Sequence, residues 1–261
     1  MDNIAIIAAA GWKGGGKNLG LPYVPMPFIK LVDDSTTISR ISGKLTSREF
    51  RVIIAVGAIG YPFRSYQQRG GFFMEQTPID EMIQELGVTP GGSPWTREIH
   101  QYAARYGELA IMPEPGWTNQ HDTFCRILDT MSDYHKVLLI QGDILLADVL
   151  WDQLFQWEPS FQFVPCPNHS IFLLKGNGLS AYRERAEMSR KRPTDPSTWN
   201  DGARAYPDGA VGSGYLQHNG VKLYGWNHTP WRLMDTGQYW LDIDNGANYN
   251  MANERIEKGL L

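Results

Sequence analysis

The sequence predicts an α/β fold with a mainly parallel central sheet, formed by a single domain that spans residues 1–261. Two observations lead to this prediction. Segments typical of strands alternate with segments typical of helices as far as residue 157, and 42% of the residues are hydrophobic. Strands that alternate with helices form a sheet whose faces the helices cover. A chain of this length can bury a substantial core.

Four apolar segments predict the strands of this sheet. They are 3–10 (NIAIIAAA), 51–57 (RVIIAVG), 108–113 (ELAIMP) and 136–143 (KVLLIQGD). The first segment is apolar on both faces, which is typical of a strand in the middle of a parallel sheet. It is too short to span a membrane and has no basic segment before it, so we expect a buried strand rather than a leader or an anchor.

Four further segments predict helices that alternate with these strands. They are 36–47, 77–87, 119–133 and 147–157. The second begins with Thr77, a residue suited to an N-cap, and ends at Gly87. The third places Phe124, Ile127 and Leu128 on one face, at the spacing of an amphipathic helix.

The pattern changes after residue 157. Residues 161–176 predict one or two short strands, 178–192 a helix that ends in basic residues, and 220–227 another strand. Residues 193–214 are rich in Pro, Gly, Asp and Ser, which predicts a long loop or lid. The chain ends in an amphipathic helix near 249–260. We expect 158–218 to be a divergent insert within the single domain.

Charge and cysteine content limit the partners and the compartment. The net charge is −4 and no long basic run occurs, so nothing suggests a nucleic-acid groove. Cys125 and Cys166 lie far apart without metal-ligand spacing, and we expect reduced thiols. The sequence therefore predicts a cytoplasmic protein with neither a nucleic-acid nor a membrane partner.

The segment AAAGWKGGGKN, residues 8–18, follows the first predicted strand. Gly11, Gly16 and Lys17 have the spacing of a P-loop, but Asn18 replaces the hydroxyl residue that would hold Mg²⁺. Gly20 and three prolines follow before residue 28, and they cannot continue the helix that a P-loop requires. A glycine-rich turn without a ligand is a second alternative. Three consecutive glycines with two lysines favour a cationic turn lined by backbone N–H groups.

This opening segment resembles that of nucleotidyltransferases with a GT-A-like fold. The family begins with a strand, L-A-A-G-x-G-[TS]-R, a loop with P-K-P-L, and a helix. Residues 6–31, IIAAAGWKGGGKNLGLPYVPMPFIKL, follow the same order. The resemblance implies a Rossmann-like, three-layer fold of GT-A type. Met26 replaces the signature lysine, so Lys13, Lys17 or Lys30 would supply the positive charge for the phosphates. The implied nucleotide-binding residues are Ala9, Ala10, Gly11, Gly14, Gly15, Gly16, Lys17 and Lys30.

Two acidic segments extend the resemblance. VLLIQGDILLADVLWDQL, residues 137–154, resembles the family's strand ending in Gly-Asp, which makes Asp143 a predicted Mg²⁺ ligand. YWLDIDNGANYNMANERIE, residues 239–257, resembles the family's W-x-D-I-D segment, which makes Asp244 the second ligand. Asp143 also follows a buried strand, at the edge where α/β proteins bind ligands. Asp242 shares a strand face with Asp244, and we expect it to support that ligand.

The same residues allow simpler structural interpretations. Asp143 could be the N-cap of the helix that begins near Ala147. Asp242 and Asp244 could form a solvated turn that contains the N-cap of the last helix.

The implied reaction joins a nucleoside triphosphate (NTP) to a small phosphorylated acceptor, a sugar 1-phosphate or a phospho-alcohol, and releases pyrophosphate. Lys17 would stabilise the leaving pyrophosphate, and Mg²⁺ on Asp143 and Asp244 would bridge the α-phosphate and the acceptor phosphate. No general base is required, because a phosphate monoester is already anionic. The insert at 158–218 would select the acceptor.

Other functions stay open at this level. A glycosyltransferase of the same architecture would consume an NDP-sugar, but it normally carries its D-x-D motif in mid-chain, whereas here D-I-D lies near the C-terminus. A non-catalytic nucleotide- or sugar-binding homologue would be consistent with Met26. The sequence does not determine the base, the acceptor or whether the chain forms a homo-oligomer.

Overall fold

The computed structural model covers the whole chain, and it describes the residues in the following ranges. They are 2–10, 24–60, 95–112, 120–131, 134–156, 161–166, 169–175, 239–243 and 245–261, the short strands at 68–69, 72–73, 215–218 and 221–224, and residues 179 and 183. Among these residues, no helix is long and apolar enough to cross a membrane.

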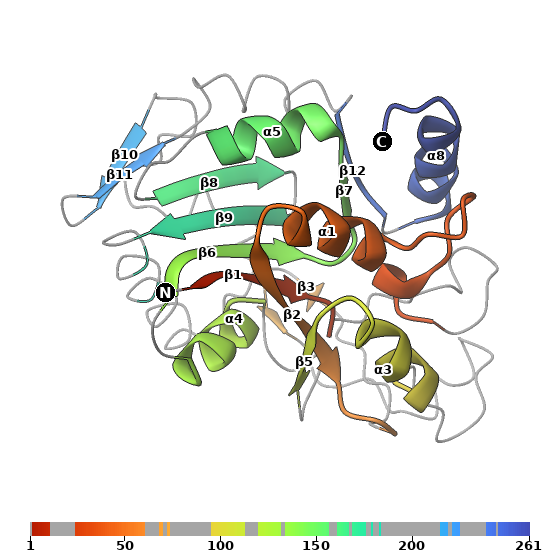
Figure 1. Cartoon of the computed structure of the whole chain (residues 1–261), viewed down its shortest axis with the longest axis horizontal. Coiled ribbons are helices and arrows are strands. Elements are labelled where there is room, and N and C mark those ends of the chain that lie inside the picture. Colours follow the sequence, from red (N-terminus) through yellow and green to blue (C-terminus); the bar gives the residue numbers. More distant parts are fainter. Residues whose placement is uncertain are drawn as a thin grey trace.

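Eight strands form the main sheet, in the spatial order β10-β11-β8-β9-β6-β1-β2-β5 (Figure 1). Their bounds are β1 Asp2–Ala8, β2 Phe50–Gly57, β5 Glu108–Met112, β6 Tyr134–Gln141, β8 Phe161–Cys166, β9 His169–Lys175, β10 Tyr215–His218 and β11 Val221–Tyr224. A second, two-stranded sheet pairs β7 (Ile144–Leu146) with β12 (Trp240–Asp242), and a third pairs β3 (Gln68–Arg69) with β4 (Phe72–Phe73).

The main sheet is mainly parallel, as the sequence predicts. β6, β1, β2 and β5 are neighbours, and each adjacent pair among them is parallel. β9 is antiparallel to both β6 and β8, so β8 has the direction of β6, and β11 pairs with β8 in parallel. All the strands except β9 and β10 therefore share one direction. The carboxyl ends of β1 and β6 lie side by side, since Ala8 is the partner of Gln141.

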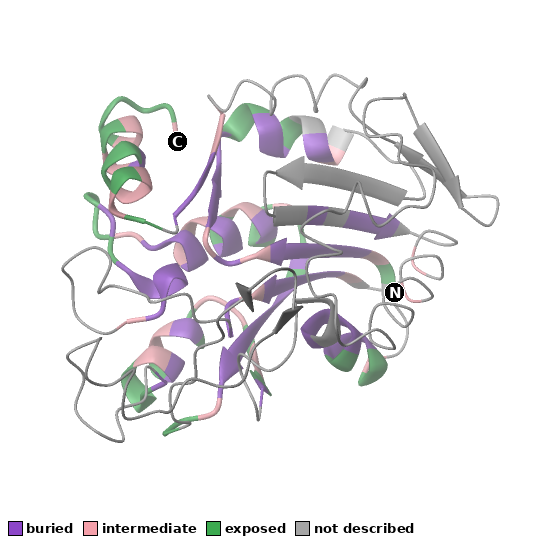
Figure 2. Cartoon of the chain, turned by 180° about the vertical axis from the view of Figure 1, so that it is seen from behind, coloured by how far each residue is buried: buried purple, intermediate pink, exposed green. Residues whose placement is uncertain are grey.

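Helices cover both faces of the sheet and give the fold three layers. In β2, Val52, Ile54 and Val56 belong to a core cluster that also contains residues of α1 (Thr37–Thr46), α3 (Arg97–Ala103) and α5 (Asp148–Gln156). Ile53 and Ala55 point to the other face, into a cluster with residues of α4 (Gln120–Asp129). Alternation along the strand separates the two clusters, and buried residues follow the central strands in Figure 2.

Helix α1 shows why the predicted helix at 36–47 forms. Thr36 is its N-cap, and a capping box joins the side chain and backbone of Thr36 to those of Ser39. Ile38, Ile41 and Leu45 repeat at helical spacing and are buried on the side that packs on the sheet. In Figure 1, α1 lies in front of the sheet.

The C-terminal helix α8 (Gly246–Glu257) packs at the side of the molecule, beside β12 (Figure 1). Residues of α8, β7 and β12 form a third apolar cluster with the short 3-10 helix η2 (Met26–Phe28). The first acidic segment, the proline segment and the C-terminal segment are therefore packed together.

Most of the predicted elements that the structure describes are confirmed. Strands are present at each of the four predicted positions, and helices are present at 36–47, 119–133 and 147–157 with shorter bounds. The segment at 161–176 forms the two strands β8 and β9, which join the main sheet. The predicted helix at 77–87 and the loop at 193–214 lie outside the described residues, as does most of the helix at 178–192. The sequence did not predict α3 or the β7–β12 pair.

Glu49 offers a test of the turn between α1 and β2. This exposed residue has φ +61°, in the left-handed region that disfavours a side chain with a β-carbon. We expect Glu49→Gly to raise the free energy of unfolding by about 0.5–1 kcal/mol, measured by urea denaturation. Glu49→Ala removes the same charge but keeps the β-carbon, so its stability should match the wild type. Equal stabilisation by both variants would contradict the backbone explanation.

Candidate functional site

The Gly142–Asp143 turn is the centre of the candidate site. It follows β6, and the Gly142 N–H donates to the carbonyl oxygen of Ala8 over 2.9 Å, at the end of β1. The Asp143 carbonyl oxygen accepts from the Ile243 N–H over 3.0 Å, just past the end of β12. The turn is thus fixed between the strand before the glycine-rich segment and the C-terminal D-I-D segment, and the Asp143 residue is half-buried.

Gly142 also brings the proline segment to this place. A β-carbon added at Gly142 would lie 3.1 Å from Cβ and Cγ of Pro27 and 3.2 Å from Cβ of Ala9. These distances are shorter than ordinary van der Waals contact, so glycine permits the close approach. Three motifs that are widely separated in the sequence therefore meet at one point, at the carboxyl edge of the sheet, where open α/β folds bind ligands.

The second acidic segment lies directly beside Asp143. β7 and β12 are antiparallel, with Asp242 opposite Ile144 and Leu241 opposite Leu145. The hydrogen bond from Ile243 to Asp143 continues this register by one residue. The Asp242 residue is buried, with 7% of its surface exposed, and its carbonyl oxygen accepts from Nδ2 of Asn248 over 2.7 Å. Asp244 lies outside the described residues.

The N-cap interpretation of Asp143 is wrong, and the N-cap of the last helix is the residue that follows the D-I-D segment. Helix α5 begins only at Asp148, and strand β7 separates it from Asp143. The N-cap of α8 is Asn245, whose side chain accepts a hydrogen bond from the Asn248 N–H over 3.0 Å. Neither helix uses one of the predicted ligands as its cap.

Met26 occupies the position of the family's signature lysine and is an apolar core residue. It is buried within η2 and belongs to the cluster that contains Leu145, Leu241 and Ile243, the apolar neighbours of the acidic segments. The position therefore lies next to the candidate site, but its side chain adds volume to the core instead of charge.

Lys30 is the one predicted lysine that the structure describes. Its ammonium group forms an exposed ion pair with Asp34 at 3.0 Å, and its carbonyl oxygen accepts from the Tyr249 hydroxyl over 2.8 Å. The second contact joins the residue to helix α8. A contribution of Lys30 to phosphate binding remains a prediction.

Asp33, in the loop between η2 and α1, belongs to a separate network of charged and polar groups. Asp33 pairs with Arg40 at 2.7 Å and accepts from the Ser35 hydroxyl over 2.6 Å. Burial acts to raise the pKa of the Asp33 carboxyl, but the hydrogen bonds from Ser35 and Arg40 outweigh it and lower the pKa. The carboxylate stays ionised and holds the loop before α1.

Only part of the predicted nucleotide-binding segment is described. Ala9 and Ala10 are buried in the clusters on opposite faces of the sheet, so their contribution to a nucleotide site would come from the backbone. The Ala9 N–H already donates to the Ala55 carbonyl oxygen over 3.1 Å. The rest of the predicted segment lies outside the described residues: Gly11, Lys13, Gly14, Gly15, Gly16 and Lys17.

The donor set of the two acidic segments fits Mg²⁺ by type. Carboxylate oxygens are the protein ligands that Mg²⁺ prefers, and it usually keeps waters and substrate phosphates in its remaining positions. Asp143 and Asp242, the described acidic residues of the two segments, carry such oxygens on adjacent backbones. No group of three acidic, histidine or cysteine side chains that could enclose a metal occurs among the described residues, so bound phosphates and waters would have to complete the coordination.

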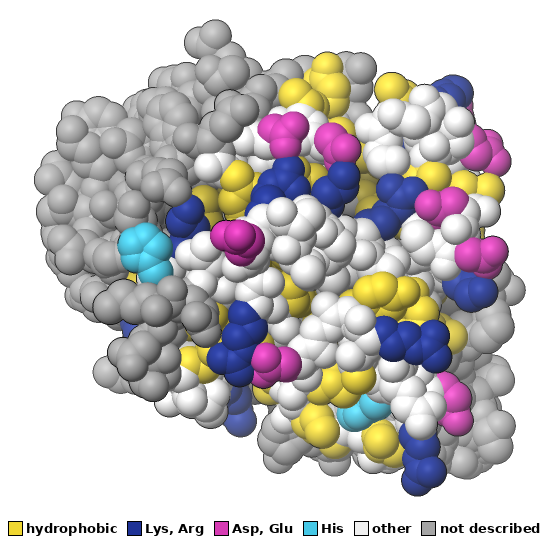
Figure 3. Space-filling model, in the orientation of Figure 1, with side chains coloured by type: hydrophobic (Ala, Val, Ile, Leu, Met, Phe, Trp, Pro, Cys, Tyr) yellow, Lys and Arg dark blue, Asp and Glu magenta, His cyan; other side chains and the backbone are white. Residues whose placement is uncertain are grey.

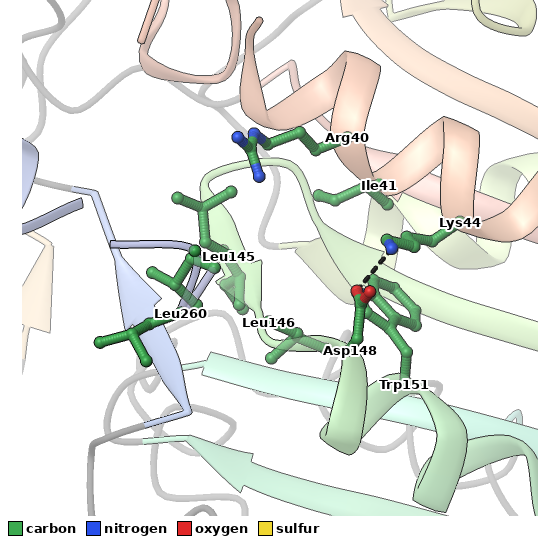
Figure 4. Close-up of a pocket in the computed structure, with 11 residues that line it drawn as sticks. Arg40, Ile41, Lys44, Leu145, Leu146, Asp148, Trp151 and Leu260 are labelled. Carbon is green, nitrogen blue, oxygen red and sulfur yellow. Dashed lines mark ion pairs between the residues drawn. The ribbon is translucent and has the colours of Figure 1, made fainter. Parts of the chain in front are cut away.

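A pocket of about 220 Å³ lies on the α1 side of β7 (Figure 4). Its lining includes Ile41, Leu145 and Trp151, and Lys44 pairs with Asp148 at 2.5 Å. Figure 3 shows cationic side chains beside acidic ones over this part of the surface. Of the predicted site residues that the structure describes, none lines it. Its lining does include Ile144, the residue that follows Asp143, so the pocket begins next to the Gly142–Asp143 turn.

Two features near the site were missed in the sequence. Thr37 is buried, and its hydroxyl contacts the carbonyl oxygens of both Pro27 and Gly142. At the end of β2, His100 Nε2 donates to the Gly57 carbonyl oxygen over 2.7 Å, and the Trp95 ring packs against Gly57. Two threonines before an apolar helical pattern indicate an N-cap, which is Thr36. No nearby residue indicated that the Thr37 hydroxyl contacts Gly142.

Comparisons with known proteins support the fold. No model of a protein family matches the chain, and no curated protein does. Among solved structures, a nucleotidyl transferase from Methanothermobacter thermautotroptrophicus aligns over 98% of both chains with a TM-score of 0.54 and 12% identity. A putative glucose-1-phosphate thymidylyltransferase from Bacillus anthracis aligns over 97% of this chain and 94% of its own, with a TM-score of 0.49 and 10% identity. The inositol-1-phosphate CTP transferase from T. maritima aligns over 98% and 96%, with a TM-score of 0.44 and 13% identity.

The alignment with the Methanothermobacter protein, which has the highest TM-score of the three, shows the fold. This chain has the fold of the Methanothermobacter nucleotidyl transferase over nearly its whole length. The predicted Rossmann-like, three-layer α/β fold with a mainly parallel sheet is confirmed.

Proposed function

We propose that this protein is a nucleotidyltransferase that joins an NTP to a small phosphorylated acceptor, a sugar 1-phosphate or a phospho-alcohol, and releases pyrophosphate. The observation that carries the proposal is the hydrogen bond from the Ile243 N–H to the Asp143 carbonyl oxygen. It brings together two acidic segments that are far apart in the sequence, next to the strand that leads into the glycine-rich turn. The fold shared with a nucleotidyl transferase supports this choice.

The proposed reaction forms a bond between an acceptor phosphate oxygen and the α-phosphorus and breaks the bond between the α-phosphorus and the oxygen that leaves with pyrophosphate. The acceptor oxygen is already anionic, so the protein needs no general base and acts by positioning both phosphates and offsetting negative charge. Backbone N–H groups of residues 11–17 would hold the triphosphate, and Lys17 would stabilise the leaving pyrophosphate. Residues 158–218 would select the acceptor.

Asp143 and Asp244 are the proposed ligands of Mg²⁺, and buried Asp242 would support them from the same segment. When bound, the ion supplies positive charge that orients the phosphates and stabilises their oxygens. The Ile243–Asp143 hydrogen bond supports this choice, because it fixes the separation of Asp143 from the residue before Asp244. A fixed separation is required, since Mg²⁺ demands nearly ideal octahedral geometry.

A pyrophosphate-release screen tests the proposal. Each of the four common NTPs is incubated with a panel of sugar 1-phosphates and with phosphocholine, in Mg²⁺ and in EDTA. We expect release that requires one NTP, one phosphorylated acceptor and the metal. Transfer that starts from an NDP-sugar would replace the proposal by a glycosyltransferase, and nucleotide binding without turnover would replace it by a binding protein.

A further inference from the structure

We infer that Thr37 is a positioning residue, which holds the turn that presents Asp143. The inference rests on the proposed function, which gives the turn its role of presenting a metal ligand. The contacts of Thr37 are observed independently of that function. Thr37 is the first residue of α1 and is almost fully buried, with 2% of its surface exposed. Its Oγ1 lies 3.1 Å from the Pro27 carbonyl oxygen and within hydrogen-bond distance of the Gly142 carbonyl oxygen.

The chemistry of a hydroxyl group explains why this arrangement orients the turn. A threonine hydroxyl carries one hydrogen, and a carbonyl oxygen can only accept. The two carbonyl groups therefore share one donor, which draws η2 and the Gly142–Asp143 turn to the same point. The Gly142 carbonyl belongs to the peptide plane that leads into Asp143, so its direction fixes where the Asp143 Cα lies.

Among the described contacts, three hydrogen bonds hold the backbone of the turn, and Thr37 provides the one that comes from a side chain. The Gly142 N–H donates to Ala8, and the Asp143 carbonyl accepts from Ile243. Both of these bonds extend strand pairing and would form in any sequence with this topology. The Thr37 hydroxyl depends on side-chain identity, since Val or Ala in its place could not donate.

The start of α1 is itself anchored, so Thr37 can act as a fixed point. Thr36 caps the helix, and its Oγ1 lies 3.1 Å from the Tyr102 hydroxyl of α3. The Tyr102 ring packs edge-on against Phe28 of η2, with ring centroids 6.5 Å apart. Hydrogen bonds and ring packing thus join α1, α3 and η2 behind the turn. A donor placed on such a rigid base holds its acceptor more precisely than one on a loop.

Amide hydrogen exchange, followed residue by residue without substrate, tests the inference. Thr37→Val keeps the shape of the side chain and removes the donor. We expect exchange at the Gly142 and Ile243 amides to become about tenfold faster relative to the amides of β2. Thr37→Ser restores the hydroxyl and should restore the slow exchange. Ser42→Ala is the matched control: its hydroxyl is buried on the same helix and has no hydrogen-bond partner among the described residues, so its loss should change neither amide.

Metal dependence provides the second measurement. If Thr37 positions a metal ligand, Thr37→Val should raise the Mg²⁺ concentration for half-maximal activity about tenfold, and Thr37→Ser should reverse this. Faster exchange of all amides in Thr37→Val, or no change at Gly142 and Ile243, would overturn the inference. If the wild type shows no metal-dependent turnover, the proposed function fails, and the exchange measurement still decides whether Thr37 holds the turn.

Discussion

Asp143→Asn is expected to lower the rate of pyrophosphate release about a thousandfold, while the melting temperature changes by no more than about 2 °C. Asparagine has the size and shape of aspartate but no negative charge, so it binds Mg²⁺ poorly. The bond that joins the turn to Ile243 uses the Asp143 backbone carbonyl, which the substitution leaves in place. Activity and stability should therefore separate in this variant, as measured by a coupled pyrophosphate assay and by calorimetry.

Asp148→Asn is the matched control for the loss of activity expected in Asp143→Asn. Asp148 lies close in sequence, at the first residue of α5, and its exposed carboxylate pairs with Lys44 of α1. Its replacement removes one negative charge of the same kind and should leave turnover unchanged. A large loss of stability in Asp143→Asn would show that the carboxylate is structural, and unchanged turnover would remove it from the site.

Local patterns were sufficient to predict much of the fold. The continuous apolar segments at 51–57 and 136–143 predicted strands buried on both faces, and the structure places them at the centre of the sheet, one on each side of β1. The helix at 36–47 was predictable because Thr36 precedes apolar residues at helical spacing. These features depend on near neighbours in the chain, which the sequence displays directly.

The parts that escaped prediction depend on contacts between distant residues. The pairing of β7 with β12 brings Leu145 to Leu241, and each strand is only three residues long, so neither has a periodic pattern of its own. Helix α3 has seven residues and follows Trp95, whose packing partner Phe28 lies far away in the sequence. The resemblance predicted that Asp143 and the D-I-D segment lie at one site, but no sequence pattern indicated that the Thr37 hydroxyl lies between two carbonyl groups.

Gly57→Ala is expected to lower the free energy of unfolding by about 3 kcal/mol or more. An added β-carbon would lie 2.2 Å from Nε1 of Trp95 and 2.4 Å from Cδ1, inside the indole ring. Trp95 cannot move away easily, because it is buried and packs edge-on against Phe28 with ring centroids 6.1 Å apart. The Gly57 carbonyl is also held by His100 at 2.7 Å, so the strand end cannot shift alone. Chemical denaturation measures the effect.

Gly43→Ala is the control with the opposite expected sign. Gly43 lies within α1, and nothing stands within 4 Å of an added β-carbon, so alanine should stabilise the helix by about 0.5–1 kcal/mol. A double-mutant cycle then identifies why Gly57→Ala lowers the free energy of unfolding. Once Trp95→Ala has removed the ring, Gly57→Ala should destabilise the protein by less than about 1 kcal/mol more, because the two substitutions act on the same contact. If Gly57→Ala is equally damaging with and without the indole, the strand itself requires glycine, and the close packing of Trp95 on β2 is not the reason.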